Sequence, residues 1–317
     1  MDVNRRALHA LTRLEELAYL GSVNQVETDH GGTIFDLGVS TPGGLQAGLE
    51  MSRLLMSDLA TVSVMTTPDD VSPLRVQVET DHPLWACIGS QYAGWPLQTD
   101  DYFAMASGPM RSARGEEKII SQYDLESSSA TVVGGLEADK LPTDAAIELV
   151  ASACHVAPSS VVLLVAPVTS LAGTIQVVAR SIETAMHKLH ELKFDLRQVR
   201  SGVGSAPLPP PAADTLNGIG RTNDAILYGA DITLWVDADD DLLQQIGPQV
   251  PSGSSSAFGK PFVEIFREHN HDFYQIDPML FSPAMVRFVN LRSGRTFQFG
   301  QRRDDILQAS FGIDAVK

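Results

Sequence analysis

Apolar residues recur at helical spacing in several segments of this chain. In the first segment Leu8, Leu11, Leu14 and Leu17 share one face, and Gly21 follows as a carboxy-terminal cap. We expect this face to pack on a sheet. The same spacing, in one case after a glycine turn, predicts helices over 3–20, within 41–56, and over 144–154, 174–192, 260–270 and 304–311.

Runs of β-branched and other apolar residues predict strands between these helices. They lie at 32–39, 60–65, 75–78 and 161–167, and two more fall within 218–239 after a glycine-bearing loop. Residues 101–113 are predicted as a loop, and the proline-rich stretch 204–214 as an extended connector. The strand and helix rhythm predicts an α/β fold of the α+β type.

The length of the chain predicts two domains, because 317 residues exceed the size at which a single hydrophobic core stops growing. Ser127, Ser128 and Ser129 form a polar break between apolar stretches. We therefore expect an N-terminal α/β domain over 1–127 and a C-terminal α/β domain over 128–317. In the alternative arrangement, residues 128–203 are a domain inserted between two halves of an outer domain.

The net charge narrows the classes of partner. Acidic residues outnumber basic residues by 39 to 23, which gives a formal charge of −16 at pH 7 and opposes binding to nucleic acid or to an anionic membrane surface. The longest apolar stretch, 161–168, is too short to cross a bilayer, so we expect no membrane anchor. Cys87 and Cys154 lie among small apolar residues, which is typical of reduced core thiols and of a cytoplasmic protein.

One face of the predicted helix 174–192 carries four ionisable residues. These are Arg180, Glu183, His187 and His190, and the apolar residues of the helix lie on a different face. The stripe is a solvated face with an ordinary ion pair, or a metal site formed by Glu183 and the two histidines. In a third interpretation Arg180 tunes a partly buried Glu183, which positions or deprotonates a water. The spacing alone leaves all three open.

Three glycine-rich loops are candidate ligand contacts. They are TPGG at 41–44, ASGP at 106–109 with Arg111 close by, and GIGR at 218–221. Backbone amides in such loops can approach an anion closely, although glycine more often marks a plain turn. The loops match neither the Walker A sequence nor the dinucleotide pattern GxGxxG, so no nucleotide site is predicted.

Several longer blocks together resemble methenyltetrahydromethanopterin cyclohydrolases. They are TDHPLWACIGSQYAGW, DYFAMASGPMRSA, VAPVTSLAGTIQVVARSIETAMHKL, GRTNDAILYG and GKPFVEIFREHNHDFYQIDPMLFSPA. The blocks occur in the order of that family and span nearly the whole chain. The resemblance implies two α/β domains with a deep ligand pocket between them, a small-molecule pterin substrate, a homotrimer, and no metal or organic cofactor.

The resemblance also implies a reaction and a catalytic pair. The reaction is the reversible addition of water to 5,10-methenyltetrahydromethanopterin, which gives the 5-formyl compound and a proton. The pair of the family, an arginine and a glutamate three residues apart, matches Arg180 and Glu183 and favours the third interpretation of the stripe. An electrophilic amidinium carbon needs a placed water and a carboxylate rather than a metal Lewis acid.

Polar residues in glycine-bounded loops are the candidate substrate-binding groups. They are Asp81, His82, Tyr92, Ser107, Gly108, Pro109, Arg111, Arg221, Thr222, Asn223 and Asp224. Tyr92 departs from the family pattern, because archaeal members carry Lys in QKAGW where this chain has SQYAGW. We interpret the departure as an adaptation to a pterin carrier with a different tail.

Two other function classes are weighed against this one. A pterin-binding protein without catalysis would need neither member of the pair, and the presence of both Arg180 and Glu183 disfavours it. A metal-dependent amidohydrolase would use Glu183, His187 and His190 as ligands. Treatment with a chelator separates that enzyme from a metal-free one.

Overall fold

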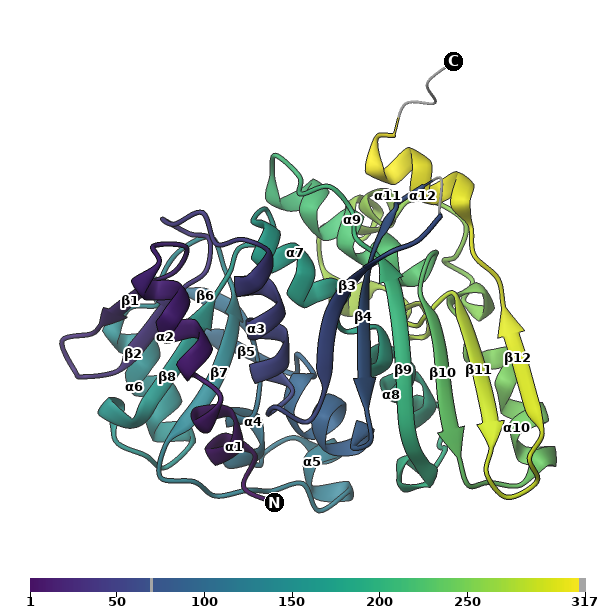
Figure 1. Ribbon diagram of the computed structural model, residues 1–317, viewed down its shortest axis with the longest axis horizontal. Helices are drawn as coiled ribbons and strands as arrows, with labels where there is room; N and C mark the ends of the chain where they lie inside the picture. The colour runs from purple at the N-terminus through teal and green to yellow at the C-terminus, as the bar shows by residue number, and fades with distance from the viewer. Residues whose placement is uncertain (69–70, 314–317) are drawn as a thin grey trace. The chain divides into compact units, whose positions relative to one another are not determined.

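The computed structural model describes residues 1–68 and 71–313, which form two compact units (Figure 1). The first unit comprises Met1–Thr61 and Trp85–Gln176, and the second comprises Val62–Leu84 and Val177–Lys317. Each unit has a six-stranded sheet with helices packed on it. The predicted α/β fold of the α+β type is therefore confirmed.

The division into units differs from the boundary expected at residue 128. That residue lies inside the first unit, because β7 (Val132–Glu137) pairs with β6 (Phe103–Ser107) on one side and with β8 (Val161–Val165) on the other. Neither 128–317 nor 128–203 corresponds to one of the two units. Hydrogen bonds between strands that are distant in sequence decide the division, and the polar break at the three serines does not.

The sheet of the first unit has the strand order β1-β2-β8-β7-β6-β5. Its other strands are β1 (Asn24–Glu27), β2 (Thr33–Asp36) and β5 (Trp95–Gln98). Strands β2, β8 and β7 are parallel, and the outer pairs are antiparallel. All five residues of β8 are buried, as expected for a parallel strand that is covered on both faces.

Helices cover both faces of this sheet. They are α1 (Val3–His9), α2 (Thr12–Tyr19), α3 (Leu45–Leu55), α4 (Met110–Arg114), α5 (Lys118–Gln122) and α6 (Asp144–Ala153). One core cluster joins α6 to Leu163 of β8, and another joins α1, α2 and α3 to Leu164. Consecutive residues of a strand point to opposite faces, so the two clusters lie on the two sides of the sheet.

The sheet of the second unit has the strand order β12-β11-β10-β9-β4-β3. Its strands are β3 (Thr61–Thr66), β4 (Leu74–Thr80), β9 (Val199–Pro207), β10 (Asp231–Val236), β11 (Met285–Asn290) and β12 (Thr296–Gly300). Strands β10 and β11 are parallel, whereas β9 is antiparallel to both β4 and β10. The pairing of β4 with β9 explains why residues 62–84 belong to this unit.

One face of this second sheet lies in the core of its unit. Ile232 and Leu234 of β10 are fully buried, and they alternate with the partly exposed Thr233 and Trp235. Helices α8 (Ser181–Glu191) and α9 (Thr215–Leu227) pack on the strands of this sheet. The remaining helices of the unit are α10 (Asp240–Ile246), α11 (Phe262–Glu268) and α12 (Asp304–Phe311).

Shorter helical segments complete the chain. They are the π-helix η1 (Leu84–Gln91) and the 3₁₀ turns η2 (Pro158–Ser160), η3 (Leu196–Gln198), η4 (Gly247–Gln249), η5 (Ser252–Ser254), η6 (Phe273–Gln275) and η7 (Pro278–Leu280). Among residues 1–68 and 71–313, no helix is both long enough and apolar enough to cross a membrane.

The prediction of a loop at 101–113 is wrong. This segment forms β6 and then α4, which begins two residues after Gly108. Ala104 and Ala106 point into the core and alternate with the less buried Phe103 and Met105. The period of two is present in the sequence, but alanine carries too weak a strand preference to reveal it.

The prediction of a glycine-bearing loop and a strand at 218–227 is also wrong, because these residues belong to α9. Asp214 caps the helix by accepting the N–H of Asn217 at 2.9 Å. Gly220 faces α11, where an added Cβ would lie 3.0 Å from the Cβ of Val263. The glycine therefore permits two helices to pack closely and does not mark a turn.

Two predicted helices are each divided in the structure. The helix expected over 3–20 is interrupted between α1 and α2. The helix expected over 174–192 is interrupted at Ala179 and Arg180, between α7 (Leu171–Val178) and α8. The apolar periodicity continues through both breaks, so it did not reveal them.

Candidate active site

The proposed catalytic pair lies at the start of α8. Arg180 is the residue that precedes the first turn, and Glu183 is the third residue of the helix. Backbone N–H groups in the first turn of a helix have no partner in the helix and favour a nearby negative charge. The break that the sequence did not reveal thus places the carboxylate of Glu183 where an anion is stabilised.

The first turn of α8 lies close to strand β9. A Cβ added at Gly204 would lie 2.7 Å from Oγ of Ser181 and 2.8 Å from Cγ1 of Ile182. A Cβ at Gly202 would lie 3.3 Å from Cγ2 of Ile182. The two glycines therefore allow the helix to approach the strand, and they set the distance between β9 and the helical turn that carries Glu183.

Burial distinguishes Glu183 from an ordinary surface residue. Only 5% of its surface is exposed, and Arg180 is half-buried. The interpretation of the stripe as a solvated face is therefore wrong at this end of it. A buried carboxylate keeps its charge only with nearby donors or cations, and both Arg180 and the helix N-terminus are nearby in the chain.

The histidines of the stripe lie farther along α8. Burial lowers the pKa of His187, and the Glu191 carboxylate, 3.8 Å from Nε2 of this histidine, partly offsets the effect. Burial also lowers the pKa of His190. In the part of the chain that the structure describes, no three His, Cys, Asp or Glu side chains are placed to hold a metal ion. The metal interpretation of the stripe therefore gains no support.

Lys188 is a polar residue of α8 that sequence reasoning missed. Its side chain is fully buried, and its ammonium donates to the carbonyl of Met279 and to Oγ of Ser254, the latter at 3.3 Å. Burial lowers the pKa of Lys188 to about 8, and the negative charge of Asp277 opposes this shift. Lys188 ties α8 to the segment that contains η5 and η7, and no local pattern signals a buried lysine.

The candidate loop Ser107, Gly108 and Pro109 is a tight connection between β6 and α4. Gly108 has φ +96°, and an added Cβ would lie 3.0 Å from Cδ2 of Leu55. Its N–H donates to the carbonyl of Ser90 at 2.9 Å. The positive φ and the contact with Leu55 explain why glycine occupies this position. The hydrogen bond to Ser90 places the loop beside the end of η1.

Arg111, expected to contact substrate, is fully buried in the first unit. Its Nε and Nη2 donate to the two carboxylate oxygens of Glu117 at 2.8 and 2.5 Å. Its Nη1 donates to the carbonyls of Ile88 and Ser90 at 3.0 and 3.2 Å. The guanidinium therefore supports η1 from within, because the π-helix leaves carbonyls that need donors.

Tyr92 follows η1 and is half-buried. The guanidinium carbon of Arg111 lies 4.9 Å from the centre of the Tyr92 ring, a distance at which a cation attracts an aromatic face. Gly94 leaves room for this arrangement, because a Cβ there would lie 2.8 Å from Cε1 of Tyr92. The Tyr92 ring is thus held in place by the buried arginine.

Asp81 and His82 follow β4 and are exposed. The carboxylate of Asp81 accepts a hydrogen bond from Oγ of Ser201 at 2.7 Å. Ser201 alternates with Gly202 along β9, so its side chain lies on the face of the strand opposite to the one that α8 covers. The structure therefore does not bring Asp81 together with the first turn of α8.

The segment Arg221 to Asp224 lies on α9 and makes contacts within the second unit. Arg221 donates to the carbonyls of Ser310 and Pro210, Thr222 to that of Gly218, and Asn223 to that of Ile219. Arg221 thus fastens α9 to α12 and to the proline-rich connector, whereas the bonds of Thr222 and Asn223 lie within α9. Their nomination as substrate contacts stays a prediction.

Asp224 is fully buried and holds the start of α11. Its Oδ1 accepts the N–H of Phe262 at 2.8 Å. Burial raises the pKa of Asp224 to about 7, although hydrogen bonds from Ser310 and Phe262 lower it in part. Its carboxyl group is enclosed by the second unit, and its nomination as a substrate contact stays a prediction.

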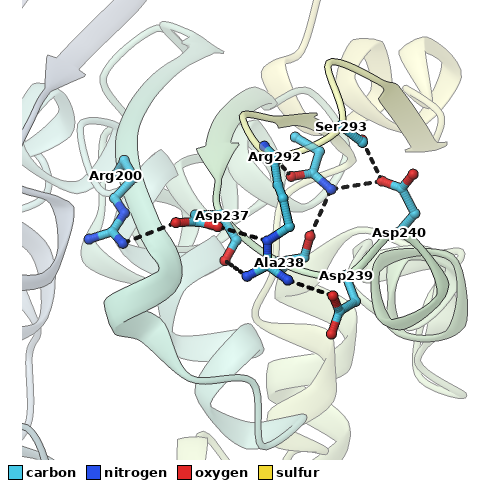
Figure 2. Close-up of polar contacts among 8 residues, drawn as sticks. Arg200, Asp237, Ala238, Asp239, Asp240, Arg292 and Ser293 are labelled. Atoms are coloured by element: carbon cyan, nitrogen blue, oxygen red, sulfur yellow. Dashed lines mark hydrogen bonds and ion pairs between the residues drawn. The ribbon is translucent and has the colours of Figure 1, made fainter.

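A second polar cluster, also missed in the sequence, lies after the parallel strands β10 and β11. Arg292 lies between Asp237 and Asp239 (Figure 2). Its Nε donates to Oδ1 of Asp237 at 3.0 Å and its Nη1 to Oδ1 of Asp239 at 2.5 Å. Arg200 of β9 reaches Asp237 at 3.3 Å. Hydrogen bonds from Arg292 and Arg200 lower the pKa of Asp237. The arginines pair with these acids, so the cluster fastens the loops at this edge of the sheet.

The nominated residues thus divide between the two units. Arg180, Glu183, Asp81, His82 and residues 221–224 belong to the second unit, and Tyr92, residues 107–109 and Arg111 belong to the first. Within the second unit, the nominated catalytic carboxylate, Glu183, is buried in the first turn of α8. Within the first, Tyr92 and the loop 107–109 adjoin η1.

The chain is similar to known cyclohydrolases over nearly its whole length. Residues 2–311 match a family model described as Cyclohydrolase (MCH). The methenyltetrahydromethanopterin cyclohydrolase of Rhodopirellula baltica is 53% identical over 89% of this chain and 87% of that protein. Proteins of the same name from Methylobacillus flagellatus and Methanococcoides burtonii are 41% and 37% identical, over 90% and 100% of this chain and 88% and 100% of their own lengths.

These matches first define the class, which is that of the cyclohydrolases. Identity at this level over almost all of both chains then identifies the family. The chain belongs to the methenyltetrahydromethanopterin cyclohydrolase family.

Proposed function

We propose that this chain is an enzyme that hydrolyses 5,10-methenyltetrahydromethanopterin reversibly to 5-formyltetrahydromethanopterin. The reaction class follows from the name of its relatives, which match the chain over most of its length. The observation that carries the proposal to particular residues is the buried Glu183 in the first turn of α8, three residues after Arg180.

Glu183 is the proposed base. The methenyl carbon lies between two nitrogens and carries positive charge, so water attacks it once a base removes a proton from that water. A carboxylate next to the cation also stabilises it, and in a site with little water this electrostatic effect is strong. Burial of Glu183 with 5% exposure meets this condition.

Arg180 is the proposed orienting residue. An arginine stays charged at all relevant pH values, so it holds the neighbouring carboxylate ionised and ready to accept a proton. Its place before the first turn of α8 gives its side chain access to the same helix end as Glu183. When Glu183 accepts a proton and loses its negative charge, Arg180 also favours the tetrahedral intermediate.

The proposal includes no metal and no organic cofactor, because the substrate carbon is already electrophilic. One experiment tests the reaction, the metal and the base together. Purified protein is treated with a chelator, and the loss of absorbance of the methenyl substrate is followed for wild type and for Glu183→Gln. We expect rapid turnover by wild type and a decrease of kcat by about 10² to 10⁴ in the variant.

Other outcomes of this experiment identify the alternatives. Activity that disappears with the chelator and returns with added metal would identify a metal-dependent amidohydrolase. Binding of the pterin without turnover under either condition would identify a pterin-binding protein. Wild-type activity in Glu183→Gln would remove Glu183 from the mechanism.

We further propose a cytoplasmic homotrimer that acts in one-carbon metabolism and binds the pterin through Tyr92 and the loop 107–109. The half-buried Tyr92 ring, held by Arg111, supports the first of these contacts. Sedimentation equilibrium tests the trimer. Comparison of Tyr92→Lys with wild type on carriers with and without a phosphorylated tail tests the role of Tyr92, and we expect the lysine variant to gain affinity for the phosphorylated carrier.

A further inference from the structure

Glu191 extends the polar stripe of α8 by one further turn, and the stripe becomes more exposed from Glu183 toward Glu191. Glu183 itself is 5% exposed, the side chain of His187 is 18% exposed, and that of Glu191 is 35% exposed. Each of these residues is four positions from the next, which places them on one face of the helix about 6 Å apart at Cβ. The stripe therefore leads from a buried carboxylate to the surface in two steps.

The proposed hydrolysis leaves one proton on Glu183 in every turnover. When water attacks, one of its O–H bonds breaks, the oxygen bonds to the methenyl carbon, and the proton moves to the carboxylate. The C–N bond then breaks, and the remaining hydroxyl proton moves to the departing nitrogen. The cation and water thus become the formyl compound and one proton, which must leave Glu183 before the next turnover.

We propose that His187 relays this proton from Glu183 toward solvent, past Glu191. The relay rests on the proposed function, because it has a purpose only if Glu183 accepts the proton. In this proposal His187 takes the proton from Glu183 and does not touch the substrate, so it is a positioning residue and not a catalytic residue. In the reverse reaction the same residues deliver a proton to Glu183.

The charges around His187 suit a transient carrier. Burial keeps its imidazole neutral at neutral pH, which leaves one ring nitrogen able to accept a proton. The Glu191 carboxylate, 3.8 Å from Nε2, attracts the imidazolium toward the exposed end of the stripe. The positive charge of Lys188 disfavours the imidazolium, so the proton does not remain there.

Rescue by a diffusible buffer tests the relay, because a buffer replaces a proton carrier but does not repair a structural defect. The variant is His187→Gln, which keeps the size and hydrogen-bonding capacity of the side chain. In dilute buffer we expect its kcat to fall at least about tenfold with KM unchanged. Rising imidazole concentration at constant ionic strength should restore most of this loss, whereas wild type should not respond.

His190→Gln is the matched control, since His190 is another partly buried histidine of α8. We expect its kcat to stay within about twofold of wild type. Equal losses in both variants without rescue by imidazole would overturn the relay, as would a His187→Gln enzyme with wild-type kcat in dilute buffer. Lack of turnover by wild type itself would instead refute the proposed function, so the two failures are distinguishable. Thermal unfolding of each variant verifies that it is folded at the assay temperature.

Discussion

Substitution of Gly204 by alanine tests whether the close approach of α8 to β9 sets the activity. The added Cβ would lie 2.7 Å from Oγ of Ser181, 2.8 Å from Cγ1 of Ile182 and 2.8 Å from Cδ1 of Ile232. Atoms that are not bonded to each other essentially never lie so close to a Cβ, so the neighbouring side chains must shift, and we expect the first turn of α8 to move away from the strand. Glu183 belongs to that turn and moves with it.

Two opposing terms set the effect on stability. Insertion of a methyl group into a packed interior costs about 1–3 kcal/mol. Replacement of glycine by alanine in a strand stabilises the protein by about 0.5–1 kcal/mol, because it reduces the conformational entropy of the unfolded chain. We therefore expect the free energy of unfolding to fall by about 1–2 kcal/mol, which leaves the protein folded.

The effect on catalysis should be larger than the effect on folding. A shift of about 1 Å in a catalytic group costs up to about 10²-fold in rate. We expect kcat of Gly204→Ala to fall about 10- to 100-fold with a smaller change of KM, as measured from the absorbance of the methenyl substrate. Gly202→Ala is a milder version of the same perturbation, because its added Cβ would lie 3.2 Å from Cδ2 of Leu234 and 3.3 Å from Cγ2 of Ile182, so we expect a smaller loss of kcat.

A double variant gives a further check on this reasoning. Ser181→Ala removes the hydroxyl that lies nearest to the new Cβ, so it should restore part of the activity that Gly204→Ala loses. A Gly204→Ala protein that is destabilised as expected but has wild-type kcat would show that the height of this turn does not control catalysis.

Two further predictions concern residues that were nominated for binding and that lie in the interior. The raised pKa of Asp224, about 7 against an ordinary 3.8, means that the unfolded chain loses its proton first as the pH rises. The contribution of Asp224 to the free energy of unfolding should be fully present below about pH 4 and be lost by pH 7, a decrease of at most about 4 kcal/mol. Urea denaturation between these pH values should show this decrease in the wild type and not in Asp224→Asn. Equal slopes in both proteins would contradict the assignment. Arg111→Lys should lower the free energy of unfolding by about 3 kcal/mol, because lysine cannot reproduce the paired bonds to Glu117. The control is Arg13→Lys in the exposed pair with Glu16, which should change the free energy of unfolding by less than about 1 kcal/mol. Similar losses in both arginine variants would refute the structural role of Arg111.

Local pattern predicted the elements that have large apolar residues and clear caps. The unbroken apolar run at 161–167 predicted β8, and the helical spacing predicted α3, α6 and α12. The three-residue spacing of Arg180 and Glu183, together with the family blocks around it, was enough to nominate the catalytic pair. These signals are local, because strand and helix periods and a motif spacing involve residues that are near one another in the chain.

Local pattern failed where a distant segment decides the structure. Glycines predicted a loop at 218–221, but Gly220 lies inside α9, where it permits close packing against Val263 of α11. Ser127 to Ser129 predicted a boundary, but β7 completes a sheet with strands from both sides of it. In each case the decisive contact joins residues far apart in sequence, which no local composition records.

The sequence by itself determined the family, the α/β class and the two residues on which the chemistry is proposed to depend. Only the tertiary structure decided which polar groups are buried. The sequence nominated Arg111 and Asp224 as substrate-binding residues. Both are enclosed in the structure, and the energy of a buried charge depends on partners such as Glu117 and the N–H of Phe262. The tertiary structure also interrupted the helix at Arg180 and so set Glu183 in the first turn of α8. The electrostatic character of that carboxylate is a property of its position in the fold.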